Sequence, residues 1–499
     1  MLDQKRNSNI IKQAITGSVF NVFASIATIV IGFSRSVLLA RLLLPEEIGI
    51  FSLALFFIHL FGKMQISGFT IAFVQKKEYT QKDIGTHFWL RVCSFIVMCT
   101  VVLLATPFLH FFYPEQELLI AVLWGLVCIE MIHGINATPL ALLSKKLDFR
   151  RIAILKVFGS IIALFVAGSL AFSGAGVWSL VGQEASIAVV NFVGLWLVSR
   201  PWQPTFNFSS DSAKDYLRFF RFTFWTANID LLLDKFDDFW IGTVSNSQSL
   251  GYYSKAYEMA QYPRAGLAAP LINVFYPTFA LLQDDRQQLS QAYFRVMSLL
   301  VRIGFWFTGV FILVAPQFVL LILGEKWLPM TTTLQFMIIY VMLDPLHLLS
   351  GRLITAVGNP KSLTQTKIVQ LIFFIPAVIL LERLAGINGV AMAANLMMII
   401  GFIFLLTKLH HYVDFSLRRL MLHPFIALNI SFIVTWFIVS NSHIELQFGI
   451  LLIKICVLSA IYAGWLLLFE RRQIMMLFNY GFAYWQDRKL SSIHPEKNM

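Results

Sequence analysis

The feature that most constrains this chain is a series of fourteen apolar segments separated by short gaps. A helix needs about 20 mostly apolar residues to cross the hydrocarbon core of a bilayer, and a chain in lipid must satisfy its backbone hydrogen bonds internally. The segments cover residues 15–43, 47–74, 86–110, 117–143, 152–172, 176–198, 222–245, 251–281, 296–323, 331–357, 363–382, 387–407, 421–440 and 448–469. The sequence therefore predicts an all-α polytopic membrane protein with about 14 transmembrane helices. The second, seventh and eighth segments are the least apolar.

The composition excludes two other classes of protein. Of the 499 residues, 58% are hydrophobic and only 13% are charged, whereas soluble domains are about 25% charged. A disordered chain and an ordinary soluble domain are both excluded. The first apolar segment is too long for the core of a cleaved signal peptide. Cys93, Cys99, Cys128 and Cys456 lie in apolar segments without metal or redox spacing, so we expect small buried side chains.

The basic residues between the segments predict the orientation in the membrane. Most of the 39 Lys and Arg side chains fall at the two termini or in every second gap, and the opposite gaps contain only Arg41, Lys326 and Arg383. Cytoplasmic gaps carry the excess of Lys and Arg, so we expect both termini in the cytoplasm. The net charge of +12 is then a consequence of topology, and nucleic-acid binding is not needed to explain it.

No gap is long enough to hold a folded domain. The longest, 200–221, predicts a linker followed by a short amphipathic helix on the cytoplasmic face, and 471–489 predicts an interfacial segment. The sequence has no nucleophile elbow, no phosphate-binding glycine loop and no histidine pair with metal spacing. We therefore expect a protein that is not an enzyme and has no cofactor or metal site. A membrane glycosyltransferase or polymerase is the alternative from the enzyme class, and the missing catalytic loop argues against it.

A short internal repeat divides the chain. Residues Ile48–Ala54 resemble residues Leu250–Ala256, and both stretches follow an external turn and open an apolar segment. Six segments separate them, so the two halves insert in the same direction, which is typical of transporters with a site between the halves. The other explanation is chance similarity between apolar sequences. We expect an N-terminal lobe at 1–199, a C-terminal lobe at 200–420, and two further helices with a tail at 421–499.

Three motifs resemble those of a known family. Arg35–Gly49 (RSVLLARLLLPEEIG) is similar to the signature at the first turn of oligosaccharide flippases. Leu250–Tyr257 (LGYYSKAY) with the later Pro263 resembles a second element of that family, and Ala356–Lys361 (AVGNPK) resembles a third. The motif order and the number of segments match over essentially the whole chain. The chain resembles the Wzx-type polysaccharide transporter branch of the multidrug/oligosaccharidyl-lipid/polysaccharide superfamily, and in particular colanic-acid-type exporters.

The resemblance implies a V-shaped pair of six-helix lobes around a central cavity in a bacterial inner membrane. It implies a substrate made of an undecaprenyl-pyrophosphate-linked oligosaccharide, turned from the cytoplasmic to the external leaflet for lipopolysaccharide O-antigen, exopolysaccharide or capsule synthesis. A polymerase and other polysaccharide-assembly proteins are the protein partners that it implies. The alternative within the superfamily is a cation-coupled drug antiporter. Glu258 departs from the family, many of whose members have a basic or neutral residue there.

Cations inside the segments are candidates for binding a pyrophosphate. An unpaired charge in mid-membrane costs about 2.5–3.5 kcal/mol on insertion scales, and fixed Lys and Arg side chains offset that cost through charge-assisted hydrogen bonds. We expect the substrate site to contain Arg35, Lys63, Lys255 and Arg264. The alternative is structural ion pairing, for example of Lys255 with Glu258. Arg91, Lys156, Arg302 and Arg352 lie closer to the cytoplasmic ends, and we expect them to extend to the headgroup region.

The seventh segment carries acidic residues on one helix face. Asp230 and Asp234 are four residues apart, and Asp237 and Asp238 continue the same face. We expect Asp230 and Asp234 to couple transport to Na⁺ or H⁺, with Asp230 the deepest. The alternative is that these acids neutralise cavity cations such as Lys235 and Lys255.

Two further patterns mark the interior of the segments. The pairs Glu130/His133 and Asp344/His347 are three residues apart, and interhelical hydrogen bonds explain them better than proton relays. Pro263, Pro270 and Pro277 in the eighth segment each remove a backbone hydrogen bond, so this helix should bend. The bend suits a lateral gate for a lipid tail or a static kink.

Overall fold

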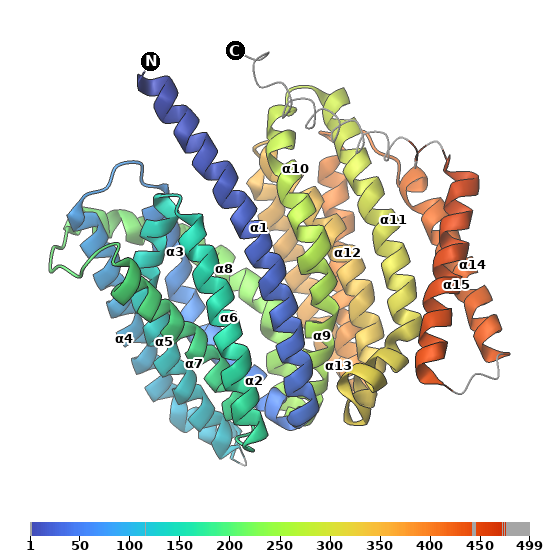
Figure 1. Cartoon of the computed structure of the whole chain (residues 1–499), viewed down its shortest axis with the longest axis horizontal. Coiled ribbons are helices and arrows are strands. Elements are labelled where there is room, and N and C mark those ends of the chain that lie inside the picture. Colours follow the sequence, from blue (N-terminus) through green and yellow to red (C-terminus); the bar gives the residue numbers. More distant parts are fainter. Residues whose placement is uncertain (1, 115, 442–445, 472, 474, 476–499) are drawn as a thin grey trace. The chain divides into compact units, whose positions relative to one another are not determined.

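A computed structural model of the chain describes residues 2–114, 116–441, 446–471, 473 and 475, without the side chains of 2–19, 63–67, 222, 267, 269–271, 273 and 274. Within this part the elements are helices joined by turns, with no strand (Figure 1). The helices are α1 Leu2–Leu42, α2 Pro45–Ile58, α3 Met64–Gln75, α4 Gln81–Phe112, α5 Glu117–Lys145, α6 Phe149–Phe172, α7 Trp178–Phe192, α8 Ser210–Val244, α9 Ser247–Pro263, α10 Ala269–Leu281, α11 Arg286–Phe318, α12 Thr331–Ala356, α13 Pro360–Leu409, α14 Leu417–Ser440 and α15 Gln447–Phe469. Most of the predicted interfacial segment 471–489 lies outside the described residues.

The helices confirm an all-α integral membrane protein. Each of the fourteen predicted segments coincides with helix, and eleven helices of the described chain are long and apolar enough to cross a membrane. α8 and the pair α9–α10, which hold the seventh and eighth segments, are not among the eleven. α13 holds two segments, because its backbone leaves the helical conformation at Ala385 and at Gly386, where φ is +56°. The count of fourteen crossings stays a prediction.

Polar residues begin the helices at alternate turns. A side-chain oxygen accepts a backbone N–H at the starts of α4, α6, α8, α11, α13 and α14, from Thr80, Asp148, Ser209, Asp285, Asn359 and Ser416. Such caps satisfy N–H groups that have no partner within the helix. At Asp285 the hydrogen bond from the Gln288 N–H lowers the pKa of the carboxyl. All six caps lie at turns that the charge distribution assigns to the cytoplasm.

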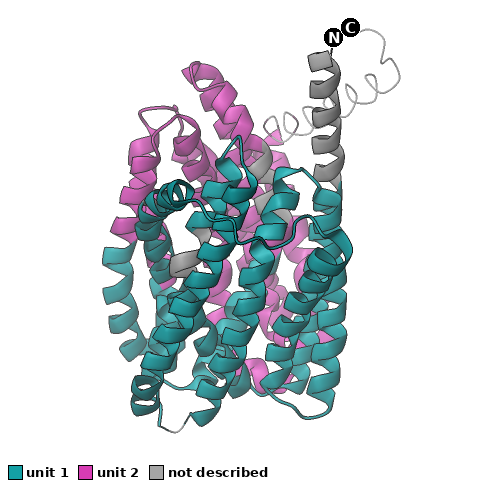
Figure 2. Cartoon of the chain, turned by 90° about the vertical axis from the view of Figure 1, so that its left-hand side faces the viewer, with its two compact units in different colours: residues 1–262, 371–393 teal, residues 263–370, 394–499 magenta. Residues whose placement is uncertain are grey.

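The chain divides into two compact units (Figure 2). Unit 1 comprises residues 1–262 and 371–393, and unit 2 comprises 263–370 and 394–499. These bounds differ from the predicted lobes, because α8 packs on α2, α3 and α4 inside unit 1, and because α14 and α15 pack on α11 inside unit 2. The division into compact units does not test the repeat, so the lobes at 1–199 and 200–420 stay a prediction.

The two copies of the repeat meet in unit 1. A Cβ atom on Gly49 would overlap the carbonyl oxygen of Ser247, and one on Gly251 would overlap that of Pro45. Glycine therefore permits the starts of α2 and α9 to cross with their backbones in contact. We call this the α1–α2 end of unit 1, since the turn between those helices lies there. The opposite end, with the turn between α3 and α4, is the α3–α4 end.

The predicted linker is a strap along α4 at the α3–α4 end. Trp89 Nε1 donates to the Thr205 carbonyl at 3.0 Å, and the Ser209 N–H donates to Thr86 Oγ1 at 2.8 Å. Trp202 is buried, and its Nε1 donates to Gln81 Oε1 at 3.1 Å. The short amphipathic helix predicted after the linker is not a separate element, because α8 runs without a break from Ser210.

Lys145 ties α5 to the end of α3. Its Nζ donates to the carbonyl oxygens of Phe73 at 3.0 Å and Val74 at 3.3 Å, and also to that of Lys76. These carbonyls belong to the last turn of α3 and the residue after it, where helix carbonyls lack partners of their own. A lysine from a neighbouring helix thus replaces the missing backbone hydrogen bonds.

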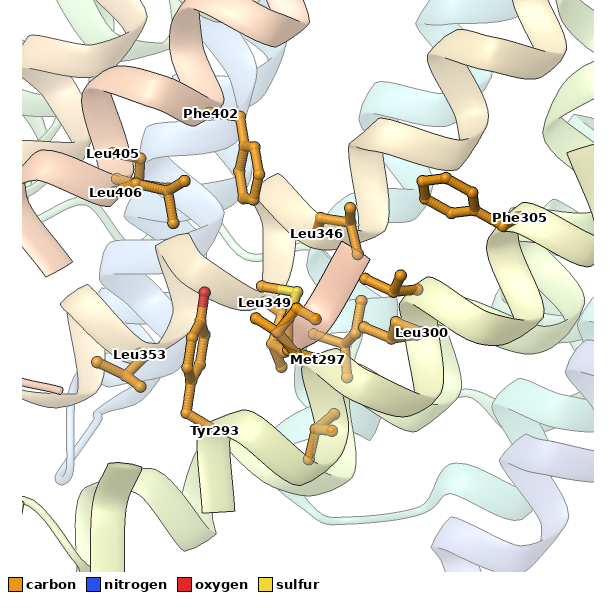
Figure 3. Packing of buried hydrophobic residues seen from close by; sticks show 14 of the residues in the cluster. Tyr293, Met297, Leu300, Phe305, Leu346, Leu349, Leu353, Phe402, Leu405 and Leu406 are labelled. Atoms are coloured by element: carbon orange, nitrogen blue, oxygen red, sulfur yellow. The ribbon is translucent and has the colours of Figure 1, made fainter. Parts of the chain in front are cut away.

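Unit 2 has a continuous apolar core between α11, α12, α13, α14 and α15. Figure 3 shows part of this core, in which Tyr293 and Met297 of α11 lie beside Leu349 and Leu353 of α12. The Tyr293 hydroxyl is 2.9 Å from Ser350 Oγ, so its polar atom is satisfied within the core.

The cysteines depart from the expected burial. Cys93, Cys128 and Cys456 are exposed, and Cys99 is half-buried, so the expected burial is wrong. α4, which carries Cys93 and Cys99, has many exposed apolar side chains, including Leu104 and Phe108. A helix in lipid has no need to bury its apolar face against protein.

Candidate functional site

Two of the predicted cations lie in one cluster between α1 and α9. Lys255 Nζ donates to Ser36 Oγ at 3.0 Å and to Glu258 Oε2 at 2.7 Å. The Tyr262 hydroxyl donates to Glu258 Oε1 at 3.1 Å, and Arg35 precedes Ser36 on α1. We call these five residues the α1–α9 cluster.

The cluster has more positive than negative charge. Arg35 and Lys255 face a single carboxylate within it, that of Glu258. The Lys255 side chain is only 4% exposed, whereas that of Glu258 is 42% exposed. Arg35 Nη1 is buried and has no hydrogen-bond partner among the described residues. Glu184 on α7 also attracts Arg35 electrostatically. The predicted ion pair of Lys255 with Glu258 is therefore present, and it leaves the guanidinium of Arg35 with hydrogen-bonding capacity.

A second cluster joins α8 to α9. Lys235 Nζ is 2.8 Å from Asp238 Oδ2, and the Tyr253 hydroxyl donates to Asp237 Oδ2 at 2.5 Å. Ser254 Oγ lies 3.4 Å from Asp238 Oδ1. We call these residues the α8–α9 cluster. It brings two buried carboxyl groups of α8 beside one lysine.

The predicted coupling residues lie outside both clusters. The side chains of Asp230 and Asp234 are exposed, whereas Asp237 and Asp238, further along the same face, are buried. The described side chains include no group of three His, Cys, Asp or Glu residues that could hold a metal ion. Ion coupling by Asp230 and Asp234 stays a prediction. The alternative expectation, that acids of this face pair with a cation, is confirmed for Asp238 and Lys235.

The other two predicted cations lie in π-helical segments. Lys63 ends the segment His59–Lys63 between α2 and α3, but its side chain is outside the described residues. Arg264 begins the segment Arg264–Ala268 after Pro263, and its Nε forms an ion pair with Asp344 Oδ2 at 2.5 Å inside unit 2. π-Helical segments within α-helices often mark functional sites. Of the four predicted cations, Arg35 and Lys255 lie in one cluster, whereas Arg264 pairs with Asp344 elsewhere.

Regular α-helix is interrupted within the eighth segment, and the predicted bend there stays a prediction. Regular α-helix ends at Pro263 and resumes in α10 at Ala269, with the π-helical segment between them. Asp344 of α12, expected to make an interhelical contact, forms an ion pair with Arg264 of a different helical segment. The acid on α12 thus fixes the residue at the break.

Two arginines expected in the headgroup region are buried. Arg91 and Arg302 are each 6% exposed, while Lys156 and Arg352 are exposed as expected. Arg302 is held by Glu470 at 2.8 Å, so a carboxylate from another part of the chain compensates its charge. The sequence does not reveal such a partner 168 residues away. The expectation of snorkelling is wrong for these two side chains.

Comparison with known proteins assigns the family. The family model described as "Polysaccharide biosynthesis protein" matches residues 38–332, which is more than half of the chain. The chain belongs to this family. The matched region contains Lys255 and the two glycines at the crossing of α2 and α9.

Two curated relatives are similar over much of their length. The chain is 25% identical to the lipopolysaccharide biosynthesis protein WzxC of Escherichia coli (strain K12) over 394 residues. These residues cover 78% of this chain and 79% of the relative. The chain is 27% identical to the succinoglycan biosynthesis transport protein ExoT of Rhizobium meliloti (strain 1021) over 280 residues, 55% of each chain.

A solved structure shares the fold. The lipid II flippase MurJ, in an inward closed conformation, superposes on this chain with a TM-score of 0.71 at 15% identity. The superposition covers 92% of this chain and 100% of the MurJ chain. At this identity the likeness shows the fold alone. The family model and the two relatives confirm the predicted resemblance to polysaccharide biosynthesis and transport proteins.

Proposed function

We propose that the protein is a flippase that moves an undecaprenyl-pyrophosphate-linked oligosaccharide from the cytoplasmic to the external leaflet by alternating access. The observation that carries the proposal is the α1–α9 cluster, in which the Lys255 side chain and Arg35 Nη1 are buried, in a membrane protein of a polysaccharide biosynthesis family. The names of the relatives support this substrate class, since they are a lipopolysaccharide biosynthesis protein, a succinoglycan transport protein and a lipid II flippase.

The chemistry of the cluster suits the diphosphate of such a substrate. A diphosphate that leaves water needs fixed donors, because an unpaired charge in hydrocarbon is costly. Arg35 supplies a buried N–H that is not used within the described chain. A guanidinium binds phosphate oxygens in a bidentate way. Lys255, fixed by Ser36 and Glu258, supplies a positive potential without having to move.

The proposal includes an orientation. Both termini lie in the cytoplasm, because the basic gaps are cytoplasmic. The bacterial relatives support a place in a bacterial inner membrane. The α3–α4 end of unit 1 then faces the cytoplasm, and the α1–α2 end faces outward. The protein performs no covalent chemistry itself, and polymerase and other assembly proteins act on its product.

The test is reconstitution of the purified protein in liposomes with a fluorescent lipid-diphosphate oligosaccharide. Movement of the label to the far leaflet is the expected result. Arg35→Gln and Lys255→Gln should each slow it at least tenfold, while Lys156→Gln, which removes an exposed cation from α6, should leave the rate within twofold. The same cluster variants, and Lys63→Ala, should stop surface polysaccharide production in cells at normal membrane levels of protein.

The drug-antiporter alternative gives the opposite pattern. A cation-coupled antiporter would move a fluorescent organic cation against a Na⁺ or H⁺ gradient and would leave the lipid-linked sugar in place. Transport of the cation without flipping, or full flipping by both Arg35→Gln and Lys255→Gln, would overturn the proposal.

A further inference from the structure

A cavity of about 330 Å³ lies inside unit 1, between α3, α4, α5 and α7. Its polar lining comes from Thr70, Arg91, His133, Asn136, Ser144 and Asn191, and none of the described residues that line it is acidic. The volume falls at the lower end of the range for small-ligand pockets, about 300–1,000 Å³. The cavity therefore combines an apolar wall with a few convergent polar groups, as ligand sites do.

The cavity extends from the α3–α4 end into the bundle. Ser144 lies in the last turn of α5, and His133 lies 11 residues earlier, which corresponds to about 17 Å along a helix. Arg91 lies 10 residues after the start of α4 at Gln81, about 15 Å along that helix. Arg91 and His133 therefore lie at comparable depths along their helices.

Arg91 places a permanent positive charge in the lining. It is 6% exposed, within an apolar bundle where a charge is expensive. Glu130, one turn before His133 on α5, interacts with it electrostatically but does not line the cavity. His87, one turn before Arg91, is engaged by Thr138 Oγ1 at 2.9 Å and Thr70 Oγ1 at 3.4 Å. Among the described groups that act on the Arg91 guanidinium, the carboxylate is therefore that of Glu130, which is not part of the cavity lining.

The far wall of the cavity is fixed in place. Asn136 is buried; its Nδ2 donates to the Ala188 carbonyl at 3.1 Å, and its Oδ1 accepts from Trp196 Nε1 at 3.2 Å. These bonds hold α5 to α7 and to the π-helical segment Val193–Ser199 that follows it, and so keep the backbone beside Asn191 in position. A cavity with a rigid polar wall is ready for a ligand without rearrangement.

We propose that this cavity binds a phosphate or diphosphate group through Arg91, with Asn191 and His133 as further donors. A guanidinium offers a fork of donors that matches two phosphate oxygens, and the lining contains no carboxylate to repel them. The group belongs either to the lipid-linked sugar, an assignment that rests on the proposed function, or to the headgroup of an anionic phospholipid. In the first case the cavity is a subsite at the cytoplasmic entrance, separate from the α1–α9 cluster.

The experiment measures binding to the full-length protein in detergent, in phosphate-free buffer, with inorganic pyrophosphate as the probe in a calorimeter. Wild type should bind pyrophosphate in this cavity in addition to any bound at the α1–α9 cluster, so every protein is also measured in an Arg35→Gln/Lys255→Gln background, in which the intact cavity should leave one bound pyrophosphate. Arg91→Gln should weaken binding at least tenfold. Ala137→Leu, which fills the cavity and keeps the charge, should weaken it as strongly. Arg151→Gln, which removes an exposed arginine from the start of α6, should bind within twofold of wild type.

A second arm identifies the source of the phosphate. Native mass spectrometry counts the lipids retained from nanodiscs of phosphatidylglycerol or phosphatidylcholine. Loss of retained phosphatidylglycerol in both Arg91→Gln and Ala137→Leu, without pyrophosphate binding by wild type, supports a phosphate site for phospholipid headgroups. Pyrophosphate binding that depends on Arg91 supports the substrate diphosphate.

The site is overturned if wild type binds neither probe, or if Arg91→Gln and Ala137→Leu bind both as wild type does. Ala137→Leu keeps the test decisive should Arg91→Gln fail to fold by size-exclusion chromatography. Absence of flipping by wild type, with Arg91-dependent pyrophosphate binding intact, would overturn the proposed function and leave the phosphate site standing.

Discussion

Gly49 and Gly251 each pack against the backbone of the other's repeat copy, Gly49 on Ser247 and Gly251 on Pro45. In the alignment of the two repeat copies, Pro45 corresponds to Ser247 and Gly49 corresponds to Gly251. Each contact therefore joins a glycine of one copy to the first of these positions in the other copy. The contact is therefore self-complementary, like an interface between two copies of one subunit. The repeat that the sequence predicts is also a repeat in space, and its two copies close the α1–α2 end of unit 1.

Adding a methyl group at either glycine should open this crossing. Gly49→Ala and Gly251→Ala each place a Cβ atom on a carbonyl oxygen that belongs to a helix backbone and cannot turn aside. We expect each variant to lose about 2 kcal/mol of unfolding free energy in detergent, measured as a lower melting temperature.

Gly134→Ala is the matched control. Gly134 lies within α5 of the same unit, and a Cβ atom there would have nothing within 4 Å. Alanine stabilises a helix interior relative to glycine, so this variant should melt at or slightly above the wild-type temperature. Equal stability of all three variants would show that the crossing is looser than described.

The buried pair Arg302–Glu470 should behave as a unit. Arg302 Nε donates to Glu470 Oε2 at 2.9 Å, Nη2 lies 2.8 Å from the same oxygen, and the two side chains are 6% and 1% exposed. Removing one partner leaves a buried charge alone, so Arg302→Met or Glu470→Met should each cost about 3–5 kcal/mol. The double variant should cost less than either single variant, because no uncompensated charge remains. Additive losses in a double-mutant cycle, measured by chemical unfolding in detergent, would contradict this.

Lys145→Met should loosen the α3–α4 end. The variant removes the ammonium that three carbonyl oxygens at the end of α3 share, and hydrogen bonds from a charged group are worth about 1.5–3 kcal/mol. We expect a loss of about 2 kcal/mol and faster amide hydrogen exchange in the last turn of α3. Lys146→Met, at the exposed neighbouring position, should change neither measurement. Unchanged exchange in Lys145→Met would mean that water serves these carbonyls equally well.

Acids of α8 should separate into two groups. Asp238→Asn leaves the mostly buried Lys235 without its 2.8 Å partner, so we expect a loss of up to about 3 kcal/mol. Asp230→Asn and Asp234→Asn alter exposed side chains and should leave the melting temperature unchanged.

The same exposed variants test the predicted ion coupling. If Asp230 and Asp234 couple transport, Asp230→Asn/Asp234→Asn should abolish the acceleration of flipping by an imposed Na⁺ or H⁺ gradient and preserve the rate without a gradient. An unchanged response to both gradients would remove these two residues from the coupling mechanism.

Helix positions were predictable because they depend on local properties of the chain. Runs of apolar residues set the length of each helix, and Pro45 and Thr80 begin α2 and α4 at positions where proline and threonine favour a helix start. The proximity of Arg35 to Lys255 followed from a repeat and a shared motif rather than from composition.

The remainder depends on contacts between distant segments. Helical spacing places Asp230, Asp234, Asp237 and Asp238 on one face, but it does not say that Tyr253 of α9 covers the last two. A long arginine side chain can extend to the membrane surface or fold inward, and only the packing of α3, α5 and α7 around α4 decides between these for Arg91.

The strap between Ser199 and Ser210 has a mechanical consequence. A flexible linker between two halves of a transporter would allow one half to change its orientation without moving the other. Here Trp89 and Thr86 hold the strap by its main chain at Thr205 and Ser209, immediately before α8 starts. The main chain is therefore anchored to α4 up to the residue before α8, so the strap leaves no free length of chain at the start of that helix.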